Sequence, residues 1–221
     1  MFSVRTAVIA SAATITLCGA SIAATPITLT FEGVGNQAQI NNFYNGGTDS
    51  QGNSGTNYGV QFGANTLALM ESDPLANFSG EPTPSTVMFF LTGTAVLNYA
   101  PGFDTGFSFY FTTLSFTGVV RVYSGLNATG TLLGSISLPA LGPGPDPANL
   151  FSNWRVGALP FSGIARSIDF GGTVNQVGYD NITFGSINPT VPEPASWLLF
   201  GIGCALLSAS SLRRTRATEP K

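Results

Sequence analysis

Phe107-Ser-Phe-Tyr-Phe-Thr112 is the stretch that decides the fold, because large apolar side chains occupy every second position. A period of two places alternate residues on opposite faces of a β-strand, so the segment predicts a strand with one buried face. The segment from Ile27 to Glu32 has the same alternation, with apolar residues at 27, 29 and 31. These two segments predict a β-domain rather than a helical one.

Nine further segments have strand character, and turn-forming residues separate them. Clusters of Gly, Pro, Asn and Ser punctuate the sequence, and no long stretch has helical periodicity. The segment Leu141-Gly-Pro-Gly-Pro-Asp-Pro147 is expected to be a loop, because prolines cannot donate to a ladder. Many short strands predict an all-β fold, a two-sheet antiparallel sandwich or jelly roll. The nine expected strands cover 59–62, 66–70, 86–91, 95–99, 119–123, 131–138, 154–159, 165–170 and 176–184.

The start of the chain has the pattern of a secretory signal peptide over residues 1–23. Arg5 supplies a positive start, an apolar stretch follows from Ala7 to Cys18, and small residues surround Ser21-Ile-Ala23. A short apolar core followed by small residues indicates cleavage after Ala23 rather than a permanent span. The exported domain is then expected to cover 24–185.

The last thirty residues combine three features in a fixed order. Val191-Pro192-Glu193-Pro194 comes first, an uncharged apolar segment covers 195–212, and a basic stop at 213–216 closes it with Arg213, Arg214 and Arg216. Eighteen uncharged and mostly apolar residues suffice for a transmembrane helix, and the arginines would stay on the cytoplasmic side. A plain C-terminal anchor would show the span and the arginines, but it would not require the Pro-Glu-Pro motif.

This layout resembles the PEP-CTERM sorting signal, which exosortase processes in Gram-negative bacteria. The resemblance implies a sorting signal over 192–216 and a tether over 186–191. It also implies that exosortase and the inner membrane are transient partners. The chain would be cut near Pro192-Glu193-Pro194 and would reach the cell surface or the exterior.

The exported segment is acidic, and this limits its partners. Arg121, Arg155 and Arg166 are its only basic residues, and it contains neither lysine nor histidine. Three basic side chains provide no footprint for a phosphate backbone, so we expect no nucleic-acid partner. Both cysteines, Cys18 and Cys204, lie in the terminal segments, so no disulfide is expected in the domain.

Glu32 and Asp180 form a candidate calcium site. They lie in the first and last expected strands, which resemble the Phe-Glu and Asp-Asn-Ile-Thr-Phe strands of galactose-binding-like and carbohydrate-binding modules. That resemblance implies a structural calcium ion. Asp180 also shares strand parity with Ile182, so without a bulge its carboxylate points into the core and needs a partner. The alternatives are a β-bulge beside Asp180 or a carboxylate bonded to the backbone.

The glycine-rich loop between Asn45 and Asn57 is the candidate source of the remaining calcium ligands. Thr48, Asp49 and Asn53 supply oxygen atoms of the kind that calcium prefers. The loop lacks the spacing of an EF-hand. On composition alone, a solvated surface loop rich in turn formers is the favoured interpretation.

Aromatic residues provide a candidate sugar site, with Tyr44, Tyr58 and Trp154 as its expected members. Exposed rings can stack on pyranose rings, and extracellular polysaccharide would then be a partner. Aromatic residues with a polar tip also occur routinely at the edges of a β-core, so the pattern has two interpretations.

The sequence favours a non-enzymatic role. Without histidine there is no Ser-His-Asp or Cys-His arrangement, and the domain has no cysteine nucleophile or zinc ligands of the usual kind. We therefore expect a structural or adhesive protein of the exopolysaccharide or biofilm matrix. The alternatives are a carbohydrate-binding jelly roll and, on several unassigned carboxylates, a glycoside hydrolase or lyase.

Overall fold

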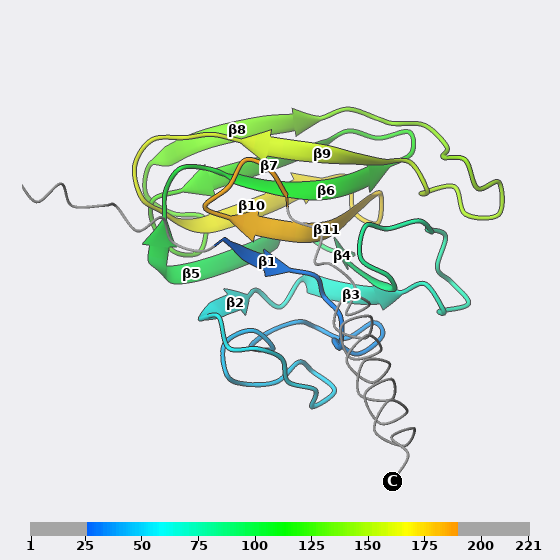
Figure 1. Ribbon diagram of the computed structural model, residues 1–221, viewed down its shortest axis with the longest axis horizontal. Helices are drawn as coiled ribbons and strands as arrows, with labels where there is room; N and C mark the ends of the chain where they lie inside the picture. The colour runs from blue at the N-terminus through cyan, green and yellow to red at the C-terminus, as the bar shows by residue number, and fades with distance from the viewer. Residues whose placement is uncertain (1–25, 190–221) are drawn as a thin grey trace, which may run out of the picture.

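The computed structural model describes residues 26–189, which form two antiparallel sheets and contain no helix (Figure 1). The all-β, two-sheet prediction is therefore confirmed for this part of the chain. Within it, no helix is long and apolar enough to cross a membrane. The predicted signal peptide at 1–23, the cleavage motif, the span at 195–212 and its arginines lie outside the described residues.

The first sheet has six strands in the order β3-β4-β11-β6-β9, and β1 pairs with β11 beside this path. β1 and β4 share one edge of β11: Leu29 pairs with Ile182, and Met88 pairs with Tyr179. All pairs are antiparallel. The strands are β1 (Ile27–Leu29), β3 (Thr66–Met70), β4 (Thr86–Phe90), β6 (Phe107–Thr113), β9 (Trp154–Leu159) and β11 (Val177–Phe184).

The second sheet has five strands in the order β2-β5-β10-β7-β8. β10 lies at its centre and pairs with β5 on one side and β7 on the other. The strands are β2 (Val60–Phe62), β5 (Ala95–Phe103), β7 (Gly118–Tyr123), β8 (Leu132–Leu138) and β10 (Ala165–Gly172).

Every expected strand occurs, and the boundaries differ mainly at β1 and β5. β1 ends at Leu29 rather than at Glu32, because Phe31 has a φ of 64° and leaves the β region. β5 continues past Tyr99 to Phe103, although it contains Pro101. The pairing of β5 with β10 shifts register between Ala165 and Ser167, and this irregularity accommodates a residue without an amide proton.

Phenylalanine rings fill the space between the two sheets. Phe107, Phe109 and Phe111 point inward from β6, as their alternation predicts, and all three are buried. The ring of Phe109 lies 6.0 Å from that of Phe170 on β10, and Phe170 lies 4.9 Å from Tyr179 on β11. These edge-to-face contacts join the sheets, and burying each ring contributes about 2–3 kcal/mol relative to exposure.

An irregular segment from residue 30 to 59 packs against β2 and β3, in the lower part of Figure 1. Its backbone bonds to β3 in both directions: the Ile40 amide donates to the Thr66 carbonyl at 3.1 Å, and the Ala68 amide of β3 donates to the Ala38 carbonyl at 3.0 Å. Within this segment, the side chains of Ile40, Phe43 and Tyr44 are buried. This segment carries Glu32, the glycine-rich loop and Tyr44, so its docking positions most of the predicted site residues.

Candidate functional site

A bulge in β11 determines where Asp180 points. The pairing of β11 with β6 shifts register between Asp180 and Thr183, and Asn181 has a φ of 48°. Tyr179 and Ile182 both lie in the core, so Asp180 is on the opposite side of the strand from Tyr179. The sequence predicts an inward-pointing Asp180 only for a strand without a bulge, and β11 has a bulge at this point. Asp180 is nevertheless fully buried, because the segment before β4 covers it.

Both oxygens of Asp180 accept backbone hydrogen bonds. Oδ2 accepts from the Thr83 amide at 2.8 Å, and Oδ1 accepts from the Asn181 amide at 2.7 Å. The Thr83 hydroxyl also lies 2.8 Å from Oδ1 of Asn181, which ties the covering segment to β11. Asp180 therefore joins a loop and a strand that are far apart in the sequence.

Glu32 approaches this region from the end of β1. The left-handed backbone at Phe31 turns the chain, and the Phe31 amide donates to the Tyr44 hydroxyl at 2.8 Å. Oε1 of Glu32 then accepts from the Thr86 amide at 2.8 Å. Glu32 and Asp180 thus hold the two ends of the segment from residue 83 to 86. The two carboxylates are therefore neighbours, as the sequence predicts, and the charge of Glu32 contributes to raising the pKa of Asp180.

Glu81 is a third carboxylate in this region, and sequence analysis missed it. Its side chain is 6% exposed, and neither carboxylate oxygen has a hydrogen-bond partner outside its own residue. The side-chain nitrogen of Asn181 is also buried without a partner. Glu81 belongs to an irregular loop with no periodicity, so no sequence signal could have placed it here. We call Glu32, Glu81 and Asp180 the carboxylate cluster.

Burial and neighbouring like charges disfavour the ionised forms of Asp180 and Glu81 in the carboxylate cluster. Burial raises the pKa of Asp180 to about 8; two backbone hydrogen bonds lower it, and the charges of Glu32 and Glu81 raise it further. Burial also raises the pKa of Glu81, with the charges of Glu71 and Glu32 adding to the effect. A buried carboxylate with few hydrogen-bond donors and like charges beside it needs a proton or a cation.

The carboxylate cluster is not a preassembled metal centre. Among residues 26–189, no three His, Cys, Asp or Glu side chains are arranged as a metal-binding group. Asp180 uses both oxygens for amides, whereas Glu32 uses only Oε1 and Glu81 uses neither oxygen. Three carboxylate oxygens of the cluster thus accept no hydrogen bond from another residue, and binding a cation would require the Glu81 side chain to move toward its neighbours.

Asp49 is placed quite differently, inside its own loop. Oδ2 accepts from the Gly35 amide at 2.8 Å and from Nδ2 of Asn53 at 2.9 Å. Oδ1 accepts from the amides of Gln51 and Asn53 at 2.8 and 2.9 Å. The carbonyl of Thr48 accepts from the Asn42 amide. Burial raises the pKa of Asp49, but these four bonds outweigh it and lower the pKa below 3.8.

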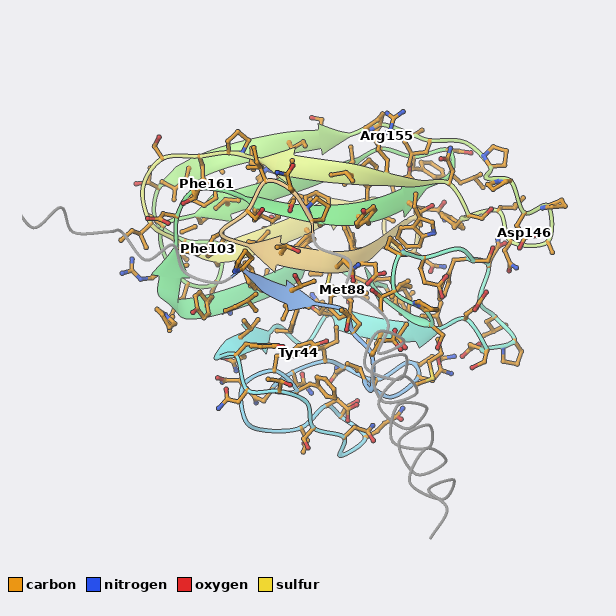
Figure 2. The ribbon with its side chains drawn as sticks, viewed as in Figure 1. Tyr44, Met88, Phe103, Asp146, Arg155 and Phe161 are labelled. Carbon is orange, nitrogen blue, oxygen red and sulfur yellow. The ribbon has the colours of Figure 1, made fainter. Side chains whose placement is uncertain are left out.

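The three aromatic residues of the predicted sugar site do not form one platform. Tyr44 is 4% exposed, and its ring lies 6.1 Å from that of Tyr58 at an angle of 28°. Trp154 is on β9, where its indole nitrogen donates to the Ser79 carbonyl at 3.0 Å. Figure 2 shows Tyr44 beside β2 and Arg155, the neighbour of Trp154, beside β9 on the far side of the molecule. Tyr44 and Trp154 therefore lie in separate regions of the domain.

The fold and these sites define a two-sheet antiparallel β-domain with a buried carboxylate cluster. Beyond this domain, residues 190–214 match the PEP-CTERM protein-sorting motif. The chain therefore carries the sorting signal that its C-terminal sequence predicts. That motif marks an exported surface protein that is held transiently in the membrane before exosortase processes it. A comparison with curated proteins gave no match.

Several solved structures are similar to part of this chain. The K2 cleaved adhesin domain of Lys-gingipain is 14% identical with a TM-score of 0.47, covering 72% of this chain and 97% of that one. The K1 cleaved adhesin domain of Lys-gingipain from Porphyromonas gingivalis W83 is 13% identical with a TM-score of 0.42, covering 74% and 99%. A carbohydrate-binding module of Cellvibrio mixtus lichenase 5A is 10% identical with a TM-score of 0.33, covering 57% and 89%.

Proposed function

We propose that the protein is a non-enzymatic structural or adhesive component of the exopolysaccharide or biofilm matrix, released to the surface of a Gram-negative bacterium by exosortase. The sorting motif at 190–214 is the observation that carries this proposal. The composition supports it, since the chain has no histidine and its domain has no thiol. A stable, acidic β-domain without a nucleophile-base pair suits a scaffold or binding role better than a hydrolase.

We also propose that calcium occupies the carboxylate cluster. The oxygens of Glu81 and Oε2 of Glu32 provide hard oxygen ligands, and the buried carboxyl of Asp180 would add a negative charge once calcium replaces its proton. When bound, calcium would neutralise these charges and tie the end of β1, the loop around residue 81 and β11 together. Thr48, Asp49 and Asn53 are not part of this proposal, because the oxygens of Asp49 are already used by its own loop.

Cell fractionation with and without the exosortase tests the sorting proposal. With the enzyme, mass spectrometry of the surface or released protein should find a chain that ends near residue 191 and lacks residues 197–213. Without the enzyme, the full-length chain should stay in the membrane fraction. Glu193→Ala should also leave the longer, membrane-bound species.

Glu219→Ala is the matched control, because it removes the same side chain beside a proline outside the sorting motif. It should be processed like the unaltered chain. A surface form that retains an intact C-terminus through Lys221 in the presence of exosortase would refute the proposal and favour a plain anchor.

A further inference from the structure

A cavity of about 270 Å³ lies on the outer side of the first sheet, away from the core. β3, β4, β6 and β11 contribute its floor, and two long loops contribute its walls. Val87 and Phe89 face it from β4, and Thr112 and Gly178 face it from β6 and β11. The cavity is separate from the carboxylate cluster and from Tyr44 and Tyr58, none of which lines it.

The missing side chain of Gly178 opens this cavity. Gly178 pairs with Thr112 in the middle of the sheet. A Cβ atom at this position would lie 3.1 Å from Cγ2 of Thr112 and 3.6 Å from Cη2 of Trp154. Any larger residue would therefore occupy the floor of the cavity. Its backbone is not left-handed, so glycine is needed here for space and not for conformation.

The two walls are held together by hydrogen bonds between loops that are about seventy residues apart. The Leu150 amide donates to Oδ1 of Asn77 at 2.8 Å, and the Phe151 amide donates to the Asn77 carbonyl at 3.0 Å. The Ser79 hydroxyl donates to Asp146 at 2.8 Å, at the outer loop that Figure 2 labels. The indole nitrogen of Trp154 donates to the Ser79 carbonyl and so anchors the loop that carries Ser79. The cavity is thus preformed.

The chemistry of the lining combines aromatic rings with unused neutral polar groups. Phe78, Phe89 and Phe151 provide the rings, and no charged side chain lines the cavity. Thr112 is 1% exposed, yet its hydroxyl has no hydrogen-bond partner. At the mouth, the side-chain amides of Asn175 and Gln176 make no hydrogen bond within residues 26–189.

We propose that this cavity binds one uncharged sugar ring of a neutral polysaccharide. A pyranose has an apolar face for the rings and hydroxyl groups for Thr112, Asn175 and Gln176. An aliphatic chain would leave the buried Thr112 hydroxyl unsatisfied, and an anionic sugar would lose its hydration without a cation to pair with it. The inference deepens the proposed matrix role and rests on it. In this proposal Tyr44 and Tyr58 do not contact the sugar, and Trp154 supports a wall of the cavity through its hydrogen bond to Ser79.

Affinity electrophoresis of the full chain tests this site. The chain, kept in a detergent without a sugar headgroup, is run through native gels that contain dextran, laminarin, mannan or galactan, with alginate as the anionic comparison. We expect at least one neutral polysaccharide to retard the protein and alginate not to retard it. The methyl glycoside of the matching sugar should release the retardation and change the fluorescence of Trp154.

Two variants and one control locate the binding. Gly178→Ala places a methyl group in the floor and should weaken binding by about tenfold. Asn175→Gly, on an exposed residue at the mouth whose φ of 56° glycine adopts freely, should weaken it severalfold without affecting folding. Gly171→Ala is the control, because Gly171 is also in a strand with an ordinary backbone, and its Cβ would make only ordinary contacts of 3.4 and 3.5 Å.

Three outcomes would overturn the proposal. If both variants bind like the unaltered protein, the sugar site lies elsewhere. If alginate binds more tightly than every neutral polysaccharide, the ligand class is wrong. If no neutral polysaccharide binds although exosortase still releases the protein, the sugar site fails while the sorting proposal stands.

Discussion

Asp49 and Asp180 are the same side chain in two opposite environments. Asp49 accepts three hydrogen bonds from its own loop and one from the Gly35 amide, and together these bonds lower its pKa. Asp180 accepts two backbone bonds but is buried beside Glu32 and Glu81, and its pKa rises to about 8. The comparison shows that the number of donors, weighed against burial and like charges, decides whether a buried carboxylate stabilises the fold as an anion.

The two carboxylates therefore respond to pH in opposite directions. Because the folded pKa of Asp49 is depressed, its contribution is present above its ordinary pKa of 3.8 and is lost as the pH falls. Because the folded pKa of Asp180 is raised, its protonated form favours the folded state at low pH. That contribution is lost as the pH rises from 3.8 to about 8.

The largest expected effect concerns the carboxylate cluster. In calcium-free buffer, the free energy of unfolding should fall as the pH rises from about 4 to 8, because the unfolded state loses the Asp180 proton first. The full shift at Asp180 corresponds to a loss on the order of 5 kcal/mol. Saturating calcium should reduce this loss, because the ion replaces the proton. Urea denaturation at each pH, with and without calcium, measures both effects.

Glu81→Gln tests whether calcium, and not only a proton, neutralises the carboxylate cluster. Without calcium at pH 8 the variant should be at least as stable as the unaltered protein, because a buried charge is removed. Added calcium should stabilise it much less than the unaltered protein. Glu71→Gln, on an exposed residue, should keep the full calcium response. Equal calcium responses in the Glu81 variant and the unaltered protein would exclude Glu81 as a ligand.

A smaller effect is expected at Asp49. Asp49→Ala removes the acceptor for three backbone amides and one side-chain amide, so it should lower the free energy of unfolding by about 3 kcal/mol at pH 7. The loss should shrink as the pH falls below 3.8 and through the depressed pKa of the folded state, because the unaltered carboxyl is then protonated too. Asp104→Ala is the control, since Asp104 accepts only from the neighbouring Thr105 hydroxyl. A loss no larger than that of Asp104→Ala would mean that water replaces these bonds.

The smallest effect is expected at Tyr44, which lies between the two regions. Tyr44→Phe leaves the buried Phe31 amide without its acceptor and should cost about 1 kcal/mol in urea denaturation. The hydroxyl of Tyr58 has no hydrogen bond within residues 26–189, so Tyr58→Phe is the matched control. A calcium response that changes in Tyr44→Phe would show that the turn at Phe31 positions Glu32.

Much of the β-domain could be predicted from local patterns. Alternation in Phe107–Thr113 identified both the strand and its inward rings, and turn-forming residues marked the ends of most other strands. The order of the strands could not be predicted, because pairing such as that of β1 with β11 depends on contacts between the two ends of the domain. The candidate site was predicted in part: Glu32 and Asp180 share a neighbourhood, whereas the Asp49 loop uses its oxygens for itself.

The sequence by itself determined the all-β class and the PEP-CTERM motif, because both are properties of consecutive residues. Only the tertiary structure decided the direction of Asp180, since a bulge at Asn181 reverses the alternation that the sequence implies. It also brought Glu81 into the carboxylate cluster and left a cavity above Gly178. Burial, unpaired polar atoms and cavities depend on which distant segments meet, and no local pattern in the chain encodes that meeting.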